Sequence, residues 1–364
     1  MTVSSWTTSA ADAGNAGRLR LACIALAALL TACDGETVQS FGGPTMGSAY
    51  RVQYVADGKS PPPERLQAGV RGILDELDRA VSTYRADSDV ARFNAAPAGT
   101  CLSMPASAVD LFKYARTLNR DSDGAFDVTL LPALSAWGFG PRGQVAERPS
   151  PDALDSLRGI VGMAHVRLSP DDPQTLCKDA ATNIEFNSIA AGYAVDRIVA
   201  YLRAQGVSSF LVDVTGELHA DGRKPDGSAW RIALEAPISN ARVAERIVRL
   251  EGLGVSTSGN YRNYFEENGV RYSHTLDPRT LAPVTHKLAS VSVIAKTALE
   301  ADGLSTLLMV LGPERGYDFA VEHKLAAFFV IKADPGVDEG DARAFAVRST
   351  PEFEKQFPSV KGST

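Results

Sequence analysis

The chain has 364 residues, of which 45% are hydrophobic and 22% charged, and its formal net charge is −6. This length is enough for one large domain or for two closely packed ones. The acidic balance excludes the basic footprint that nucleic-acid binding requires. No apolar stretch after the first 32 residues reaches transmembrane length. The composition therefore favours a globular protein without a nucleic-acid partner.

The N-terminal segment is typical of a lipoprotein signal peptide. Arg18 and Arg20 precede an apolar run, Leu21 to Leu30, that is too short to span a bilayer as a mature helix. The run ends in Leu30-Thr31-Ala32-Cys33, which resembles a lipobox. An ordinary secretory signal is the alternative, and the long polar leader leaves the true start codon open. We predict a signal peptide at residues 1–32 and lipid on Cys33.

Two cysteines remain in the predicted mature chain. Cys23 lies in the signal peptide and Cys33 carries the lipid, which leaves Cys101 and Cys177. In an oxidising compartment two thiols can pair. They could equally be two separate buried thiols, because the distance between them does not follow from the sequence.

The first half of the mature chain contains mixed elements. Residues 33–44 are interpreted as a tether, and 49–55 alternate as a strand does. Prolines at 61–63 suit the first turn of a helix, and apolar residues then recur at helical spacing. The predicted helices in this half cover residues 66–81, 107–118 and 193–205, with a long Gly- and Pro-rich loop at 137–158.

The second half is richer in strands. Thr297 opens a helix, with Glu300 three residues later as in a capping box. The predicted strands cover 210–214, 230–235, 247–250, 290–295 and 326–331, with a further helix near 314–322. Because no regular βαβ period is present, we predict an α+β fold with mixed or antiparallel sheets and packed helices. One domain over residues 45–345 would then be followed by a tail, 346–364.

A loop of small residues leads into the helix near 193. It reads Glu185-Phe-Asn-Ser-Ile-Ala-Ala-Gly-Tyr-Ala-Val-Asp196. Small side chains let a ligand approach the backbone, and the start of a helix attracts phosphate. Tight packing explains such a loop equally well.

A carboxylate and a hydroxyl share one face of the helix that Thr297 opens. Asp302 and Thr306 are four residues apart. Hard oxygen ligands of this kind suit Mg²⁺, which takes few protein ligands and completes its shell with phosphate and water. The alternative is an Asp that serves the helix dipole and a Thr that faces solvent.

Three further stretches could contact a ligand. A Ser/Thr/Gly run at 255–261 offers hydroxyls and amides to phosphate or ribose, and His274 could move a proton near neutral pH. Tyr84 could stack on an aromatic ring, and Met46 is a flexible apolar contact. A lone histidine is more often structural, and Tyr84 and Met46 could be core residues.

The order of the motifs is more specific than any one of them. The chain contains, in this order, Thr-Met-Gly, Ser-Thr-Tyr-Arg, Phe-Asp-Val-Thr, Trp-Gly-Phe-Gly, Ala-Gly-Tyr-Ala-Val-Asp, Ser-Thr-Ser-Gly-x-Tyr, His-x-Leu-Asp-Pro and Thr-Ala-x-x-Ala-Asp-Gly. This order resembles the ApbE family of FAD:protein FMN transferases, often periplasmic lipoproteins, over about residues 41–333. The resemblance implies a fold related to the T-fold.

The resemblance also implies a reaction and the residues for it. FAD and Mg²⁺ bind, a threonine hydroxyl of a target flavoprotein attacks the FMN-side phosphorus, and AMP leaves. His274 matches the expected general base. The implied metal ligands are Ser188 through its carbonyl, Asp302, Ser305 and Thr306. The implied FAD contacts are Met46, Tyr84, Ala125, Phe126, Asp127, Glu185, Ala191 and Leu276.

Several positions depart from the family pattern. Glu185 replaces the usual Asp, and Ala191 stands where Lys or Glu is common. Ser305 stands where many relatives have a third carboxylate, which removes one charge from the metal site. Thr215-Gly216-Glu217 replaces Gly-Gly-Asp. These departures bear on affinity more than on the type of reaction.

Two other functions are compatible with the same residues. Water could replace threonine, which would give an FAD pyrophosphatase that releases FMN and AMP. A non-catalytic FAD-binding lipoprotein is the third possibility, although storage of FAD needs no base.

The predicted partners follow from the predicted anchor. FAD and extracytoplasmic FMN-binding domains of membrane redox proteins are expected, with a lipid-held position on the periplasmic side of the inner membrane. Asp34 after Cys33 resembles a retention signal for that membrane. A tether of about ten residues reaches a few tens of Å at most and raises the effective concentration of the enzyme near its substrates.

Overall fold

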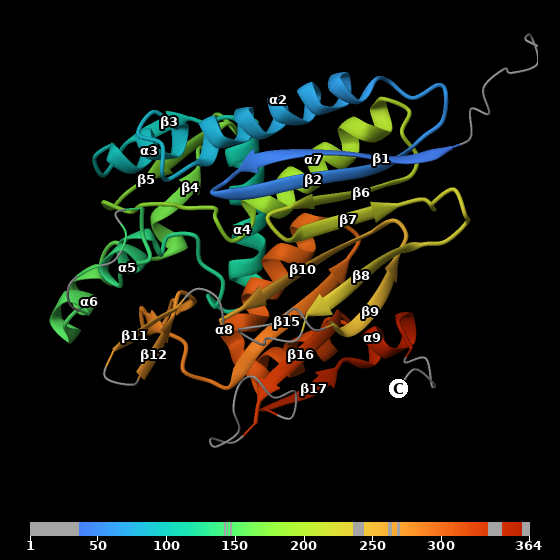
Figure 1. Cartoon of the computed structure of the whole chain (residues 1–364). Helices are drawn as coiled ribbons and strands as arrows, with labels where there is room; N and C mark the ends of the chain where they lie inside the picture. Colours follow the sequence, from blue (N-terminus) through green and yellow to red (C-terminus); the bar gives the residue numbers. More distant parts are fainter. Residues whose placement is uncertain are drawn as a thin grey trace, which may run out of the picture.

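A central antiparallel sheet organises the computed structural model, which describes residues 36–141, 143, 145, 148–235, 244–260, 264–267, 270–333 and 344–358. Its eight strands lie in the order β1-β2-β6-β7-β10-β15-β16-β17 (Figure 1). Their bounds are β1 Thr37–Thr45, β2 Ser48–Ala56, β6 Phe210–Val214, β7 Glu217–Asp221, β10 Leu253–Gly259, β15 Leu288–Ala295, β16 Ala326–Lys332 and β17 Phe345–Ser349. All seven neighbouring pairs run antiparallel, so the predicted α+β class is confirmed.

Four helices supply most of the cover of this sheet. They are α2 (Pro63–Val81), α4 (Ala106–Asp121), α7 (Ala190–Ala204) and α8 (Ala298–Glu322). As the helical spacing predicted, the apolar side of α2 is buried, with Leu66 and Val70 fully enclosed. The largest core cluster combines α2, α4 and α7 with β2 and β6. Part of α8 packs on β15 and β16 in a second cluster.

A hairpin and a short helix build a separate core cluster against the sheet. The hairpin joins β8 (Trp230–Glu235) to β9 (Ala244–Leu250), and α9 (Pro351–Gln356) contributes the fully buried Phe353. Figure 1 shows this hairpin beside β7 and β10. No helix in the described ranges is long and apolar enough to cross a membrane.

The predicted tether and tail are both wrong where the structure describes them. Residues Thr37–Thr45 form β1, which pairs with β2 along its full length. Its glycines suggested a loop, but a Cβ at Gly42 would lie 2.6 Å from the Tyr50 carbonyl oxygen, so close strand approach requires glycine there. Pro44 is tolerated because β1 is an edge strand. The predicted tail contains most of β17 and all of α9.

Two further segments differ from the sequence-based prediction. The loop predicted at 137–158 contains helix α6 (Pro151–Leu157), whose N-terminus is capped by Ser150. Residues 255–259 of the Ser/Thr/Gly run lie in β10, a strand in the middle of the sheet. Small polar residues have low strand propensity, and only the pairing of β10 with β7 and β15 reveals why this stretch is extended.

Smaller elements complete the described chain. These are α3 (Asp89–Ala95), α5 (Leu131–Ala136), η1 (Met163–His165), β3 (Cys101–Ser103), β4 (Val166–Leu168), β5 (Thr175–Lys178), β11 (Tyr264–Glu267), β12 (Val270–Ser273), β13 (Leu276–Asp277) and β14 (Ala282–Pro283). Cys101 and Cys177 are paired across β3 and β5 and form a disulfide. They are therefore not two separate buried thiols. The predicted signal peptide and Cys33 lie outside the described residues.

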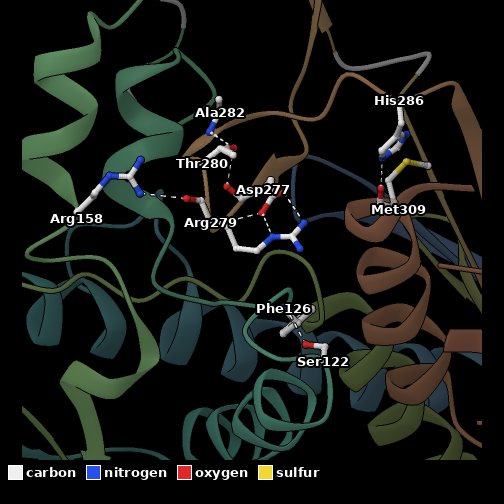
Figure 2. Close-up of polar contacts among 9 residues, drawn as sticks. All are labelled: Ser122, Phe126, Arg158, Asp277, Arg279, Thr280, Ala282, His286 and Met309. Carbon is white, nitrogen blue, oxygen red and sulfur yellow. Dashed lines mark hydrogen bonds and ion pairs between the residues drawn. The ribbon is translucent and has the colours of Figure 1, made fainter. Parts of the chain in front are cut away.

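Helix α8 is broken in the middle, which accounts for the two helices predicted there. Gly312 has φ 82° and Pro313 follows it. Since proline has no N–H, the Met309 carbonyl loses its helical donor, and His286 Nε2–H donates to it at 2.8 Å (Figure 2). The Leu288 N–H in turn donates to His286 Nδ1 at 3.3 Å, so both ring nitrogens of a neutral imidazole are used.

Candidate active site

Helices α7 and α8 meet in a junction that both caps α8 and places the predicted metal ligands. Thr297 Oγ1 accepts from the Glu300 N–H at 3.1 Å, which confirms the predicted helix start. Asp196, near the middle of α7, accepts from the N–H groups of Ala298 and Leu299 at 2.8 and 3.0 Å. Local spacing in the sequence does not predict this second cap, because the cap joins residues about 100 positions apart.

Gly192 brings the start of α7 against Asp302. A Cβ at position 192 would lie 2.5 Å from the Ala298 carbonyl oxygen and 2.8 Å from the Asp302 Cβ, so only glycine permits this approach. The Gly192 N–H, which a longer helix would direct at the Ser188 carbonyl, donates to Asp302 Oδ2 at 2.9 Å. Asp302 therefore lies against the first turn of α7, which follows the predicted ligand Ser188 in sequence and contains the buried Ala191.

A cluster of hydroxyls joins α8 to β10 around Asp302. Ser305 Oγ donates to the Asp302 carbonyl at 3.0 Å, and it lies 3.2 Å from Ser256 Oγ and 2.9 Å from Ser258 Oγ. Ser258 Oγ lies 3.4 Å from Thr306 Oγ1. The predicted ligands Asp302, Ser305 and Thr306 are thus together, but Ser305 is fully buried and its hydroxyl is already engaged.

The carboxyl groups of Asp302 and Glu217 both have raised pKa values. Burial raises the pKa of Asp302 well above its usual range, and the nearby charge of Glu217 raises it further. Burial also raises the pKa of Glu217. The hydrogen bond that Thr215 Oγ1 donates to Glu217 Oε2 at 2.8 Å lowers this pKa, but by a smaller amount. Glu217 keeps an acidic residue at the position of the Asp in the family's Gly-Gly-Asp, and this is the signal by which the sequence could indicate it.

The donor set fits a divalent cation with oxygen ligands. Neither Asp302 nor Glu217 forms an ion pair with lysine or arginine within the described ranges. The same ranges contain no group of three or more His, Cys, Asp and Glu side chains arranged to hold a metal. A cation here would rely on the Asp302 carboxylate, hydroxyls, main-chain oxygens and substrate phosphate, which is the ligand pattern that Mg²⁺ prefers.

The predicted FAD contacts at 125–127 line a buried turn after α4. Ala125 and Phe126 are buried, and the Phe126 N–H donates to Ser122 Oγ at 3.2 Å (Figure 2). Asp127 Oδ1 accepts from the N–H and the hydroxyl of Thr129 at 2.7 and 2.5 Å. Burial nonetheless raises the pKa of Asp127 above its usual value.

Glu185 lies next to this turn. Its N–H donates to the Val128 carbonyl at 2.8 Å, so the two stretches that the resemblance assigned to FAD are side by side. Burial raises the pKa of Glu185 to about 7, with a smaller upward contribution from Asp127 and a downward one from the Asn187 N–H, which donates to Oε2 at 2.8 Å. The segment from Glu185 to Gly192 therefore connects the predicted flavin side to the metal side.

Met46 lies in the β1–β2 turn, and Tyr84 follows the end of α2. Met46 and Gly47 have φ values of 47° and 73°, which a tight two-residue hairpin turn requires. Met46 lines a pocket of about 170 Å³ together with Asp78 and Tyr50, whose buried hydroxyl has no partner within the described ranges. Tyr84 is 70% exposed, which leaves its ring accessible for stacking.

His274 and Leu276 come from the β12–β13 region. The His274 ring packs edge-on against Phe139 with centroids 6.4 Å apart. Leu276 is buried in a cluster with Trp137 and Leu281, so it also serves the local core. Arg158 donates to the Arg279 carbonyl at 3.0 Å and so ties the β13–β14 hairpin to the end of α6 (Figure 2).

The fold and the site together define a class of protein. It is an α+β protein built on an eight-stranded antiparallel sheet, with a buried aspartate at the junction of two helices and a buried glutamate in the segment that leads to it. The model of the ApbE family matches residues 46–329. The chain belongs to this family.

Relatives and solved structures agree with this assignment. A protein of Vibrio cholerae named FAD:protein FMN transferase is 35% identical over 89% of this chain and 97% of its own length. The equally named protein of Escherichia coli K12 is 33% identical over 94% and 98%. The apo crystal structure of the Pseudomonas stutzeri flavinyl transferase ApbE has a TM-score of 0.81 and 51% identity, and covers 89% of this chain and 98% of that one.

Proposed function

We propose that this chain is a flavin transferase that moves the FMN part of FAD to a threonine hydroxyl of a target flavoprotein and releases AMP, with Mg²⁺ at the site of Asp302 and Thr306. Relatives that match nearly their whole length and carry the name FAD:protein FMN transferase support the activity. The observation that carries the chemistry is the segment Glu185–Gly192, which contacts the Asp127 turn at one end and Asp302 at the other.

The reaction exchanges the phosphoanhydride bond of FAD for a phosphoester bond to threonine. The threonine oxygen forms a bond to the FMN phosphorus, and the bond from that phosphorus to the bridging pyrophosphate oxygen breaks, so that AMP leaves with that oxygen. His274 accepts the threonine proton. A bound Mg²⁺ would supply charge neutralisation on the pyrophosphate. This chain's own residues hold the flavin half near Asp127 and Glu185 and place the diphosphate near Asp302.

The proposal includes a place in the cell and a class of partner. A lipid on Cys33 would hold the enzyme on the periplasmic side of the inner membrane, near the extracytoplasmic FMN-binding domains of membrane redox proteins. The disulfide between Cys101 and Cys177 is compatible with an exported, oxidising location. Because β1 begins at Thr37, only a few residues would separate the anchor from the sheet, fewer than the predicted tether.

A product assay tests this proposal against FAD hydrolysis. The protein is incubated with FAD and Mg²⁺, with and without an acceptor domain that carries the Asp-x-x-Ser/Thr-Gly-Ala-Thr type of motif. AMP release that requires the acceptor, with FMN bound to protein, supports transfer. Equal release of AMP and dissolved FMN without the acceptor would favour the pyrophosphatase, and release of neither would leave only FAD binding.

A further inference from the structure

The disulfide between Cys101 and Cys177 joins two short strands of a small sheet. Strand β3 has three residues and β5 has four, and the order β3-β5-β4 leaves β3 at an edge. Cys101 and Ser103 are exposed, whereas Cys177 is buried. A three-residue edge strand with two exposed side chains has little buried surface to hold it in place. The disulfide is therefore an important part of what keeps β3 on β5.

The backbone beside the disulfide continues the pairing of these two segments. The Lys178 N–H donates to the Thr100 carbonyl at 3.0 Å, and the Gly99 N–H donates to the Lys178 carbonyl at 2.8 Å. Lys178 directly follows Cys177 in the sequence. The position of Lys178 therefore depends on the same pairing that the disulfide closes.

The Lys178 side chain holds the segment that leads to Glu185. Its buried ammonium group donates to the carbonyls of Asn94 and Thr182, each at 3.1 Å. The Asn94 side chain donates to the Ile184 carbonyl and accepts from the Ile184 N–H, both at 2.8 Å. Ile184 precedes Glu185 directly. A short path of buried hydrogen bonds therefore runs from the disulfide to Glu185.

Asp179, the next residue, begins a second path that ends at Asp127. The Asp179 N–H donates to the His165 carbonyl at 3.1 Å, and Asp179 Oδ1 lies 2.9 Å from His165 Nδ1. Two positions before that histidine, the Met163 N–H donates to Asp127 Oδ2 at 3.2 Å. The two residues that follow the buried cysteine thus support both acidic side chains of the predicted flavin side.

We propose that the bond between Cys101 and Cys177 is a redox control of FAD binding. The oxidised protein holds Asp127 and Glu185 in the binding arrangement, and reduction releases β3 and lowers the affinity for FAD. This inference rests on the proposed function, because that function places the flavin near these two acids. A chain still in a reducing compartment then has a weak FAD site, and the site becomes strong once the chain reaches an oxidising one.

The switching step is thiol–disulfide exchange with a dithiol, either of a protein or of a small molecule. A thiolate of the dithiol attacks the sulfur of the exposed Cys101, the bond between the two protein sulfurs breaks, and Cys177 leaves as a thiolate that takes up a proton. The second thiol of the dithiol then displaces Cys101 from the mixed disulfide. Two electrons and two protons pass to the protein, which ends with two thiols, while the dithiol ends as a disulfide.

Titration of the oxidised and the reduced protein with FAD tests the proposal. Flavin fluorescence gives the Kd, alkylation followed by intact mass gives the fraction of open disulfide, and circular dichroism shows whether the reduced protein is folded. Reduction with dithiothreitol is expected to raise the Kd about fivefold or more, the lower end of the usual coupling between two sites.

Three results of this titration would overturn the proposal. The first is an unchanged Kd in fully reduced, folded protein. The second is a disulfide that excess dithiothreitol does not open while the protein is folded. The third is a loss of FAD binding only where the reduced protein unfolds as a whole, because the bond would then stabilise the fold and not the site.

Cys101→Ser combined with Cys177→Ser is the matched control for the reductant. This double variant is expected to bind FAD with the Kd of the reduced protein, and dithiothreitol is expected to leave that Kd unchanged. A Kd equal to that of the oxidised protein, or one that still depends on dithiothreitol, would contradict the proposal.

Linkage gives a second readout that does not depend on any variant. If reduction weakens FAD binding, saturating FAD must make the disulfide harder to reduce by the same factor. A tenfold effect moves the reduction potential by about 30 mV to more negative values. Equilibration with mixtures of reduced and oxidised dithiothreitol measures this shift, and equal potentials with and without FAD would overturn the proposal.

The same measurements separate this inference from the proposed function. If the oxidised protein does not bind FAD, the flavin part of the proposed function fails and the redox control fails with it. If the oxidised and the reduced protein bind FAD equally well, only the redox control is wrong.

Discussion

We assign to His274 the transfer of the threonine proton. It lies directly after β12 and packs against Phe139. We expect His274→Ala to bind FAD with nearly unchanged affinity and to transfer FMN about 10²- to 10⁴-fold more slowly, which is the usual contribution of a general base. Flavin fluorescence measures binding and AMP release measures turnover. Undiminished transfer in this variant would remove His274 from the mechanism.

Glu185 should make stability depend on pH. Its pKa is raised from 4.5 to about 7 by burial, so the folded protein holds this proton more tightly than the unfolded chain does. The contribution of Glu185 to the free energy of unfolding is complete below about pH 4.5 and is lost as the pH rises through about 7. The loss is about 3 kcal/mol at most in the free energy of unfolding.

Urea unfolding from pH 4.5 to pH 8 checks this assignment. Glu185→Gln cannot ionise, so its free energy of unfolding should fall less over this range than that of the unaltered protein. Other buried acids such as Asp302 titrate in both proteins and cancel in the difference. Parallel pH profiles would show that Glu185 does not hold its proton in the folded state.

At the scale of elements, Asn94 connects α3 to the segment that carries Glu185. Its side-chain amide donates to the Ile184 carbonyl and accepts from the Ile184 N–H, both at 2.8 Å. Buried Lys178 donates to the carbonyls of Asn94 and Thr182, each at 3.1 Å. These contacts hold the backbone immediately before Glu185, so α3 and β5 position the segment that joins the two halves of the site.

Asn94→Ala is expected to weaken FAD binding and to lower the free energy of unfolding by about 2 kcal/mol, since two buried hydrogen bonds are lost. Asn187→Ala is a matched control: its side chain is exposed, and only its backbone N–H contacts Glu185. Calorimetry and FAD titration of both variants measure the effect. Equal behaviour of the two variants would contradict a positioning role for Asn94.

The sequence predicted helices better than the edges of the sheet. Apolar spacing predicted α2, which buries one face, and the second half of α7, while strands β6 and β8 agree with the prediction to the residue. Segments whose structure depends on a distant partner were missed. Strand β1 was interpreted as a tether because its Gly and Pro residues are loop-like until Tyr50 packs against them.

For the whole molecule, the disulfide closes a large loop. Cys101 and Cys177 are 76 positions apart, so their bond restricts the unfolded chain strongly. We expect Cys101→Ser with Cys177→Ser to lower the free energy of unfolding by about 4 kcal/mol on the chain-entropy estimate. Urea unfolding of the double variant and of the reduced protein measures this loss. A stability equal to that of the oxidised protein would mean that the bond does not form in solution.

The site as a whole could be predicted only in part. The order of motifs predicted Asp302, Thr306 and the 185–192 segment as parts of the site, because the residues of each motif lie close together in the sequence. The contacts of Asp196 with α8 and of Asn94 with Ile184 join residues about 90 to 102 positions apart. Those contacts depend on the strand order and the helix junction, which local spacing does not encode.

The most direct test of the central claim is the intact mass of an acceptor domain after incubation with this protein, FAD and Mg²⁺. We expect a gain of one FMN, located on the threonine of the acceptor motif, and no gain when that threonine is replaced by alanine. We also expect the gain to be lost in Asp302→Ala. An acceptor of unchanged mass while FAD is consumed would contradict the account.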